Sequence, residues 1–191
     1  MRHGETEWSR TGQHTGRTDV PLTPLGVRQA EALATALTGR RFERVVTSPL
    51  QRAVETCRRA GLAAGAERSS DLLEWDYGEY EGRTTPEIRA TIPGWSLWRD
   101  GVPGGESAAD VGRRVDRVIA TVRLGRDDTV LFGHGHTLRV LAARWLGLSP
   151  NDGRLFALDT ASVSVLGWER EVAVVRRWND SAHLGAVPAR P

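Results

Sequence analysis

The chain has 191 residues but no lysine, a single cysteine and no long apolar run. All 26 residues counted as Lys or Arg are therefore arginines, which excludes a Schiff-base lysine and a P-loop lysine. Cys57 has no second cysteine to pair with, so neither an intramolecular disulfide nor a cysteine-rich metal site can form. No stretch approaches the roughly 20 apolar residues that a membrane-spanning helix needs.

The start of the chain and its charge balance narrow the class further. Residues 1–20 are polar and charged, unlike a signal peptide, so we expect a cytoplasmic protein without a membrane partner. The formal net charge is only +2 and the arginines are scattered, so we expect no nucleic-acid partner. Arginine still suits phosphate binding, because its planar guanidinium group donates hydrogen bonds in pairs. The length, without an internal repeat or low-complexity linker, predicts a single domain over residues 1–191.

Signals for strands and helices alternate along the chain. Short apolar runs at 44–47 and 128–132 predict strands, and runs at 162–166 and 172–175 predict a hairpin around Glu169-Arg170. Helices are expected over residues 25–37, 48–62, 106–122 and 137–146, and loops over 1–22 and 71–83. This alternation predicts an α/β fold, a three-layer α/β/α sandwich with a mostly parallel central sheet.

Three dipeptides mark helix starts. Thr23-Pro24, Ser48-Pro49 and Thr85-Pro86 each place a capping side chain before a proline, which is favoured at the first helical position. At the chain start, by contrast, a strand is expected before the first catalytic loop, yet the sequence opens at Met1-Arg2. Either the domain manages without that strand or the strand lies upstream of Met1, and we favour the second hypothesis. The tail after Ala182 is expected to be loose.

The segment Arg2-His3-Gly4-Glu5-Thr6 combines residue types that suit phosphoryl transfer. A neutral imidazole is a good nucleophile near neutral pH, and a neighbouring arginine can neutralise the oxygens of the transferring group. The glycine lets the backbone approach closely. On Arg2-His3-Gly4 alone, a surface loop with an incidental histidine is the favoured interpretation.

A second histidine lies in Phe132-Gly133-His134-Gly135-His136, between an expected strand and an expected helix. Parallel sheets place ligand sites at the carboxyl ends of their strands, and a helix N-terminus favours an anion. The two histidines could in principle chelate a metal ion, but no carboxylate or third histidine is spaced to complete a site. We therefore expect no metal, with His136 near the helix start rather than in catalysis.

Two further segments carry charged side chains that suit the same chemistry. Arg52 lies in the first turn of the helix after Thr47-Ser48-Pro49, from which it can project to the sheet edge; a solvated helix arginine is the alternative. Within residues 73–82, acidic and aromatic side chains alternate. One of these carboxyl groups, when partly desolvated, can hold a proton and serve as general acid. An acidic loop whose aromatics pack on the core is the alternative.

Together and in this order, the motifs resemble the histidine phosphatase (phosphoglycerate mutase-like) superfamily, from Arg2 to about Trp178. The motifs that carry the resemblance are Arg2 to Thr6, Leu22 to Gly26 with Gln29-Ala30, Ser48 to Ala53 with Thr56, the Glu74 loop ending at Glu81-Gly82, Gly105-Glu106-Ser107, and His134-Gly135. The resemblance implies that His3 is the nucleophile and that Arg2, Arg52 and His134 surround the phosphate. It also implies that Glu74 protonates the leaving oxygen, with no metal and no cofactor.

The resemblance assigns further residues to the substrate. It implies that Thr15, Gly16, Tyr77, Arg99 and Gly135 lie near the bound molecule. Ser9 occupies the position where relatives often have an asparagine that donates to phosphate, so a hydroxyl contact is expected there instead. Homodimers are common among such relatives, so a homodimer is one expected state.

The lengths between motifs favour hydrolysis over the mutase reaction. Only a short stretch separates Gly82 from Gly105, where the cofactor-dependent phosphoglycerate mutases carry an insertion. The motifs are similar to those of acid phosphatases and of sedoheptulose-1,7-bisphosphatase-like enzymes. We therefore expect a phosphatase of small phosphorylated metabolites such as sugar phosphates or bisphosphates. A cofactor-dependent phosphoglycerate mutase and a non-catalytic module that binds a phosphorylated ligand are the alternatives.

Overall fold

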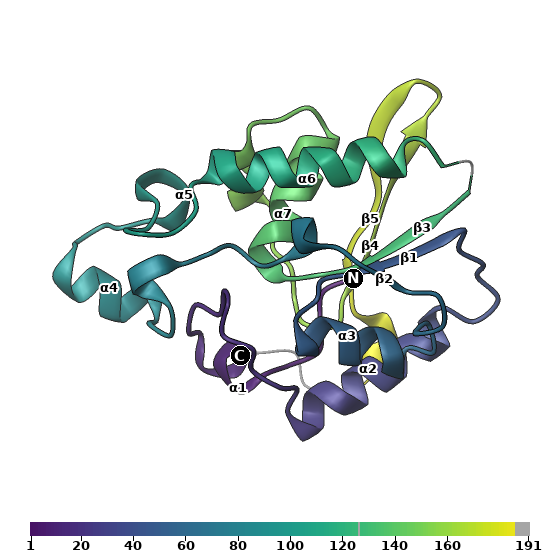
Figure 1. Ribbon diagram of the computed structural model, residues 1–191, viewed down its shortest axis with the longest axis horizontal. Helices are drawn as coiled ribbons and strands as arrows, with labels where there is room; N and C mark the ends of the chain where they lie inside the picture. Colours follow the sequence, from purple (N-terminus) through teal and green to yellow (C-terminus); the bar gives the residue numbers. More distant parts are fainter. Residues whose placement is uncertain (126, 186–191) are drawn as a thin grey trace.

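A parallel sheet between two layers of helices forms the centre of the computed structural model, which describes residues 1–125 and 127–185 (Figure 1). The strands lie in the order β2 (Glu67–Arg68), β1 (Arg44–Thr47) and β3 (Thr129–Phe132). Helices α6 (Ala108–Val122) and α7 (Gly135–Trp145) cover one side, and α2 (Pro24–Ala36) and α3 (Gln51–Arg59) cover the other (Figure 1). The predicted α/β sandwich with a mostly parallel sheet is confirmed.

An antiparallel hairpin and several short helices complete the fold. The predicted hairpin is present as β4 (Val163–Glu169) and β5 (Val172–Asp180). Three short helices are α1 (Glu7–Thr11), α4 (Thr85–Thr91) and α5 (Leu97–Asp100). Single 3-10 turns occupy residues 70–72, 78–80 and 182–184, and a longer 3-10 helix occupies residues 150–155. The 3-10 turn at 182–184 covers part of the tail that was expected to be loose; residues 186–191 lie outside the described part of the chain.

The helix starts show where local signals were sufficient. Thr23 caps α2 by accepting a hydrogen bond from the Gly26 amide, as predicted. The prediction that Ser48 caps the next helix is wrong, because α3 begins only at Gln51 and its N-cap residue, Leu50, makes no side-chain cap. The hydroxyl of Ser48 is instead bound to the ring of His134. Residues 1–22 were predicted as loop, yet Thr6 and Ser9 form a capping box that starts α1.

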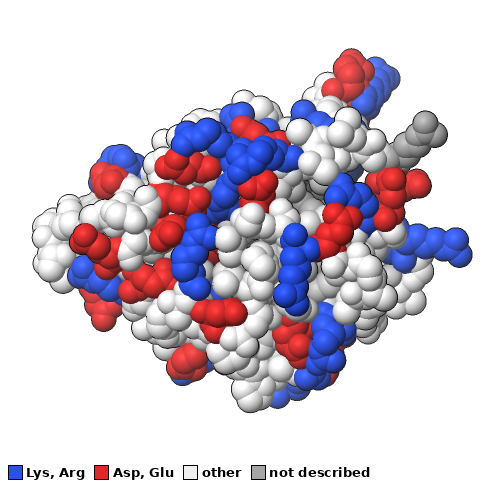
Figure 2. Space-filling model, viewed as in Figure 1, with Lys and Arg blue, Asp and Glu red and all other residues white. Residues whose placement is uncertain are grey.

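The core has two parts, one on each side of the sheet. The larger cluster fills the space below α6 and α7 and contains the fully buried Trp75 and Ile88. The smaller cluster lies between the sheet and α2 and α3, and it includes Leu33 and Cys57. The sole cysteine is therefore a packing residue. On the face shown in Figure 2, basic and acidic side chains lie side by side rather than in separate patches.

The first residues of the chain lie beside β3. The Gly133 amide donates to the Met1 carbonyl, and the His3 amide donates to the Gly133 carbonyl, each at 3.0 Å, which forms a parallel bridge at Arg2. The Met1 amino group donates to the Leu131 carbonyl at 2.7 Å. Next to Met1, a cavity of about 170 Å³ is lined by residues of β3, β4, α6 and α7. These contacts place residues 1–3 beside β3 in the way that a neighbouring parallel strand would lie. A strand upstream of Met1 stays a prediction.

Candidate active site

Two histidines that are far apart in the sequence meet at the carboxyl end of the sheet. His3 follows the bridge to Gly133, and His134 follows β3, which ends at Phe132. Their ring centroids are 5.2 Å apart, with the ring planes inclined at 58°. The two side chains are almost fully buried, at 4% and 0% exposure. The pairing of the first residues with β3 is therefore what brings His3 to His134.

The hydrogen-bond partners of the two rings define which nitrogen carries the proton. Nδ1 of His3 lies 2.7 Å from the Gly4 carbonyl, which can only accept, so this nitrogen is protonated. Nε2 of His3 consequently carries a lone pair. Nδ1 of His134 accepts a hydrogen bond from Nε of Arg52 at 3.1 Å, so its Nε2 donates to the Ser48 hydroxyl at 2.7 Å. His3 thus has the tautomer that a nitrogen nucleophile needs.

The surroundings keep both rings neutral. Burial, followed by the charges of Arg52 and Arg2, lowers the pKa of His3 well below its ordinary value. Burial and the Arg52 charge likewise lower the pKa of His134. Because an uncharged imidazole is the nucleophilic form, His3 remains reactive at neutral and mildly acidic pH.

Arg52 is completely buried and joins the histidines to the loop over residues 15–18. Besides His134, its guanidinium group donates to the carbonyls of Thr15, Gly16 and Thr18, at 2.9 to 3.1 Å. Four of its five N–H groups are used in this way, which leaves one on Nη1 for a ligand. Burial lowers the pKa of Arg52 from its ordinary value, but a guanidinium stays charged at neutral pH.

Gly135 lies where a second guanidinium group and a carboxylate approach each other. A Cβ atom at Gly135 would lie 3.5 Å from the guanidinium carbon of Arg2 and 3.6 Å from Oε2 of Glu74. Arg2 donates to the Leu158 carbonyl at 2.5 Å, which holds its side chain across the start of α7. The missing side chain at Gly135 therefore leaves room between a cation and an acid beside the two histidines.

The carboxylate of Glu74 is bound to the first turn of α7. Oε1 accepts hydrogen bonds from the backbone amides of Trp75 and Thr137, both at 2.9 Å, and Oε2 accepts one from the His136 amide at 3.0 Å. The Thr137 hydroxyl lies 3.0 Å from Oε1. Glu74 is 5% exposed, so nearly all of its contacts are with the protein. A carboxyl group held this firmly beside Arg2 is well placed for proton transfer.

The loop that contains Thr15 and Gly16 is fixed by a second carboxylate. Oε1 of Glu81 accepts hydrogen bonds from the amides of Gly16 and Thr18, at 2.9 and 3.0 Å. The carbonyls of the same loop point to Arg52. A Cβ atom at Gly16 would come within 2.6 Å of Glu81 and of the Trp75 carbonyl, so only glycine fits there. The structure therefore places Thr15 and Gly16 against Arg52.

Tyr77 belongs to an aromatic wall beside Glu74. Its hydroxyl lies 2.6 Å from Nδ1 of His136, and its ring stacks on His14 with a centroid distance of 4.7 Å. Trp98 contacts the other side of His136, at 5.3 Å between ring centroids. Burial lowers the pKa of His136 and raises that of Tyr77, so both side chains are neutral. His136, expected near a helix start, is indeed in the first turn of α7, and its ring forms part of this wall.

Ser9 and Arg99 each bind residues that are close to them in the sequence. The Ser9 hydroxyl lies 2.9 Å from the Thr6 amide and 3.0 Å from the Thr6 carbonyl, within the capping box of α1. The Arg99 side chain is 68% exposed and pairs with Asp100 at 2.8 Å. Arg99 also donates to the Gly94 carbonyl, so its contacts stay within its own short segment.

Several residues of the site had no predicted role. Ser48 was assigned to a helix cap and binds His134 instead, whereas Thr56 accepts a hydrogen bond from the Gly4 amide at 3.0 Å. Glu81 and Glu106 lie inside motifs of the resemblance, which pointed to these positions but did not predict which residues they contact. For Arg114, on α6, the sequence predicted only a position on a helix. Among the residues that the structure describes, no three His, Cys, Asp or Glu side chains group as a metal site would.

The sequence model of the histidine phosphatase superfamily (branch 1) matches residues 1–181. The chain belongs to this superfamily. An acid phosphatase of Mycobacterium tuberculosis is 41% identical over 182 residues, which cover 92% of this chain and 89% of that protein. The sedoheptulose 1,7-bisphosphatase of Saccharomyces cerevisiae is 37% identical, over 78% of this chain and 66% of that enzyme. One relative is an acid phosphatase and the other a sedoheptulose bisphosphatase, the two kinds of enzyme whose motifs resemble those of this chain.

Solved structures of the superfamily have the same fold. The product of open reading frame Rv3214 from Mycobacterium tuberculosis matches with a TM-score of 0.89 and 40% identity, over 93% of this chain and 94% of that one. The mycobacterial glucosyl-3-phosphoglycerate phosphatase Rv2419c matches with a TM-score of 0.82 and 30% identity, over 94% and 96% of the two chains. Within the described residues, no helix is both long and apolar enough to span a membrane.

Proposed function

We propose that the chain is a phosphatase that hydrolyses small phosphorylated metabolites through a phosphohistidine on His3. The tautomer of His3 carries the proposal. Its Nδ1 is committed to the Gly4 carbonyl, and Nε2 keeps a lone pair beside His134 and two arginines. A neutral nitrogen nucleophile in a pocket of positive charge suits an anionic phosphate ester.

In the first step, Nε2 of His3 attacks phosphorus and the bond from phosphorus to the ester oxygen breaks. The carboxyl group of Glu74 gives its proton to the departing oxygen, so the product leaves as a neutral alcohol. Arg2 and Arg52 stabilise the negative charge on the phosphoryl oxygens, and His134 orients Arg52 by accepting a hydrogen bond from its Nε. In the second step, water attacks the phosphohistidine and passes a proton to Glu74. The phosphorus–nitrogen bond breaks, and inorganic phosphate leaves with His3 neutral again.

The aromatic wall and the names of the relatives support a substrate class. The aromatic wall of Tyr77, His136 and Trp98 presents neutral polar groups, which suit the hydroxyl groups of a sugar or polyol. Relatives are named for sedoheptulose 1,7-bisphosphate and for phosphoserine, the latter a phosphatase from Hydrogenobacter thermophilus with 29% identity. We propose sugar phosphates or bisphosphates as the main substrates.

A panel of phosphate esters tests this proposal. Purified protein is assayed for phosphate release from sugar phosphates, sugar bisphosphates, phosphoserine and phosphoglycerates, and kcat/KM values are compared. We expect hydrolysis with a preference for a sugar phosphate, and a loss of at least about 10³-fold in the His3→Ala variant, because the covalent step is removed. Interconversion of phosphoglycerates without phosphate release would indicate a mutase, and binding without turnover would indicate a non-catalytic module.

A further inference from the structure

Glu74 lies in a segment without regular secondary structure, so its position depends on side-chain contacts. It follows the 3-10 turn over residues 70–72 and precedes the one over 78–80. No strand or helix ladder holds the backbone between these turns. A general acid must stay within hydrogen-bond reach of the leaving oxygen, so whatever fixes this segment also controls proton transfer.

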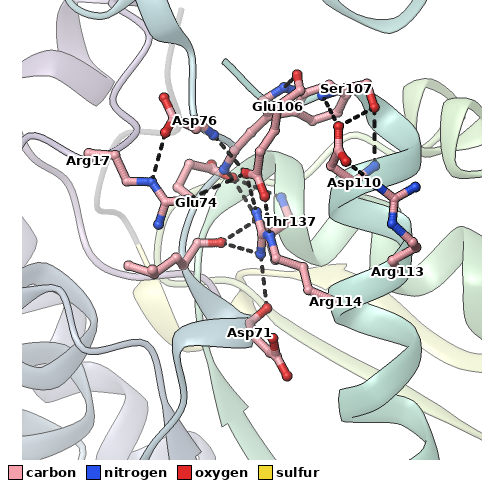
Figure 3. Close-up of polar contacts among 12 residues, drawn as sticks. Arg17, Asp71, Glu74, Asp76, Glu106, Ser107, Asp110, Arg113, Arg114 and Thr137 are labelled. Atoms are coloured by element: carbon pink, nitrogen blue, oxygen red, sulfur yellow. Dashed lines mark hydrogen bonds and ion pairs between the residues drawn. The ribbon is translucent and has the colours of Figure 1, made fainter. Parts of the chain in front are cut away.

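Arg114 fixes the segment on the N-terminal side of Glu74. Its side chain, on α6, is only 7% exposed and reaches across to the segment (Figure 3). Nη1 donates to the carbonyls of Asp71 and Leu73, at 2.9 and 2.6 Å. Leu73 is the residue directly before Glu74, so the guanidinium group holds the backbone next to the carboxylate.

Glu106 fixes the same segment on the C-terminal side. Its carboxylate forms a bidentate pair with Arg114, from Nε at 2.8 Å and from Nη2 at 3.0 Å. The Asp76 amide donates to Oε2 of Glu106 at 2.9 Å, and the Trp75 indole donates to the Glu106 carbonyl at 2.7 Å. Because a bidentate pair fixes both position and orientation, Arg114 and Glu106 hold residues 71–76 as one unit.

A third contact joins the guanidinium group to the carboxylate of Glu74. Nη2 of Arg114 donates to the Thr137 hydroxyl at 3.3 Å. That hydroxyl lies 2.7 Å from the Leu73 carbonyl and 3.0 Å from Oε1 of Glu74, so its single proton can be donated to either of them (Figure 3). All five N–H groups of Arg114 are thus used, and every acceptor belongs to Glu106, Thr137 or the segment before Glu74.

We propose that Arg114 is a positioning residue, which acts through Glu106 and Thr137 to hold the Glu74 carboxyl group at the leaving oxygen. Arg114 touches no reacting atom in this scheme. Its charge is paired with that of Glu106, so we expect its main effect on the reaction to be geometric. The inference rests on the proposed role of Glu74 as the proton donor.

The test uses two phosphate esters that differ in their need for a proton. Glycerol phosphate releases an alkoxide and needs a general acid, whereas p-nitrophenyl phosphate releases a stable phenolate and does not. The measured quantity is kcat/KM, because it reports only the steps up to departure of the leaving group. Hydrolysis of the phosphohistidine, which is common to both esters, therefore does not affect kcat/KM.

We expect Arg114→Met to lower kcat/KM for glycerol phosphate by about 100-fold, the cost typical of a displaced catalytic group. For p-nitrophenyl phosphate the loss should stay below about fivefold. Thr137→Val removes only one hydroxyl group, and it should show the same split with a smaller loss. If Arg114→Met does not fold, Thr137→Val decides the matter. Equal losses on the two esters, or no loss on either, would overturn the inference.

Arg117→Met is the matched control. Arg117 lies three residues further along α6 and pairs with the Asp71 carboxylate, so it joins the same helix to the same segment. Its side chain is 62% exposed, and it contacts neither Glu106 nor Thr137 in the described structure. We expect its kcat/KM on both esters to stay within about twofold of the parent, as for an ordinary surface ion pair.

Glu74→Gln separates the two proposals. If this variant loses kcat/KM equally on both esters, the role of Glu74 as proton donor fails. If it shows the split while Arg114→Met and Thr137→Val do not, the proton donor stands and the positioning role fails. If both hold, adding Thr137→Val to Glu74→Gln should cause no further loss on glycerol phosphate, because the two changes remove the same function.

Discussion

In a chain that begins at Met1, the amino group of this residue gives the fold a pH-dependent stability that can be removed without touching the site. The group is enclosed and bound to the Leu131 carbonyl, and burial lowers its pKa from 8.0 to about 5. At pH 7 the folded chain therefore holds this amine neutral, whereas the unfolded chain holds it protonated. Because the unfolded state binds more protons, stability rises with pH between about 5 and 8.

The size of the effect follows from the two pKa values. Folding must release the proton, which costs about 1.4 kcal/mol at pH 7 and about 2.7 kcal/mol at pH 6, relative to pH 9. These figures are upper limits, since the rest of Met1 is partly exposed. The histidines whose pKa values are lowered by burial act in the same direction, mainly below about pH 7.5, and they are the same in every variant of the chain. The contribution of the amino group is therefore the difference between two chains that differ only at Met1.

A short apolar extension before Met1 converts the amine into an amide, which can keep the hydrogen bond to Leu131 without a charge. We expect the rise in the free energy of urea unfolding from pH 7 to 9 to be about 1 kcal/mol smaller in the extended chain than in the parent chain. The extended chain should also be more stable at pH 7, because its new residues can pair with β3. An extension at the other end is the control. Identical slopes in the parent and extended chains would refute the reasoning.

Two other perturbations have defined outcomes. Ser48→Ala leaves the buried Nε2–H of His134 without its acceptor, so we expect the free energy of unfolding to fall by about 1–3 kcal/mol. Calorimetry should then show a Tm that is several degrees lower, and kcat should also fall. An unchanged Tm and kcat would contradict the assigned tautomer. Treatment with EDTA should leave phosphatase activity unchanged, because Arg2 and Arg52 supply the positive charge that Mg²⁺ supplies elsewhere. Activity that vanishes with EDTA and returns with Mg²⁺ would contradict this assignment of charge.

Local sequence signals were enough for most of the fold. β1 occupies residues 44–47 as predicted, β3 is one residue shorter than predicted, and the cap at Thr23 starts α2. These features depend on neighbours in the sequence, which patterns of residue type record directly. The short helix α5 had no such pattern, because a helix of four residues is too short to show helical spacing.

The site depends on contacts that no local pattern records. Ser48 and His134 are 86 residues apart, so a serine before a proline looked like a cap although its hydroxyl binds the histidine. Arg114 and Leu73 are 41 residues apart, so helical spacing could not show that this arginine leaves the surface and enters the Glu74 segment. The ordered set of family motifs identified His3, His134, Arg52 and Glu74 together. It could not give their hydrogen-bond partners, which arise only when the chain folds.

The most direct test of the account is to trap the phosphoryl group on the enzyme. The chain is mixed with substrate, quenched in alkali within one turnover, and digested for mass spectrometry. We predict one phosphoryl group on the peptide that contains His3, stable in alkali, lost in acid and absent from His3→Ala. A phosphoryl group on any other residue, or turnover that persists in His3→Ala, would contradict the account.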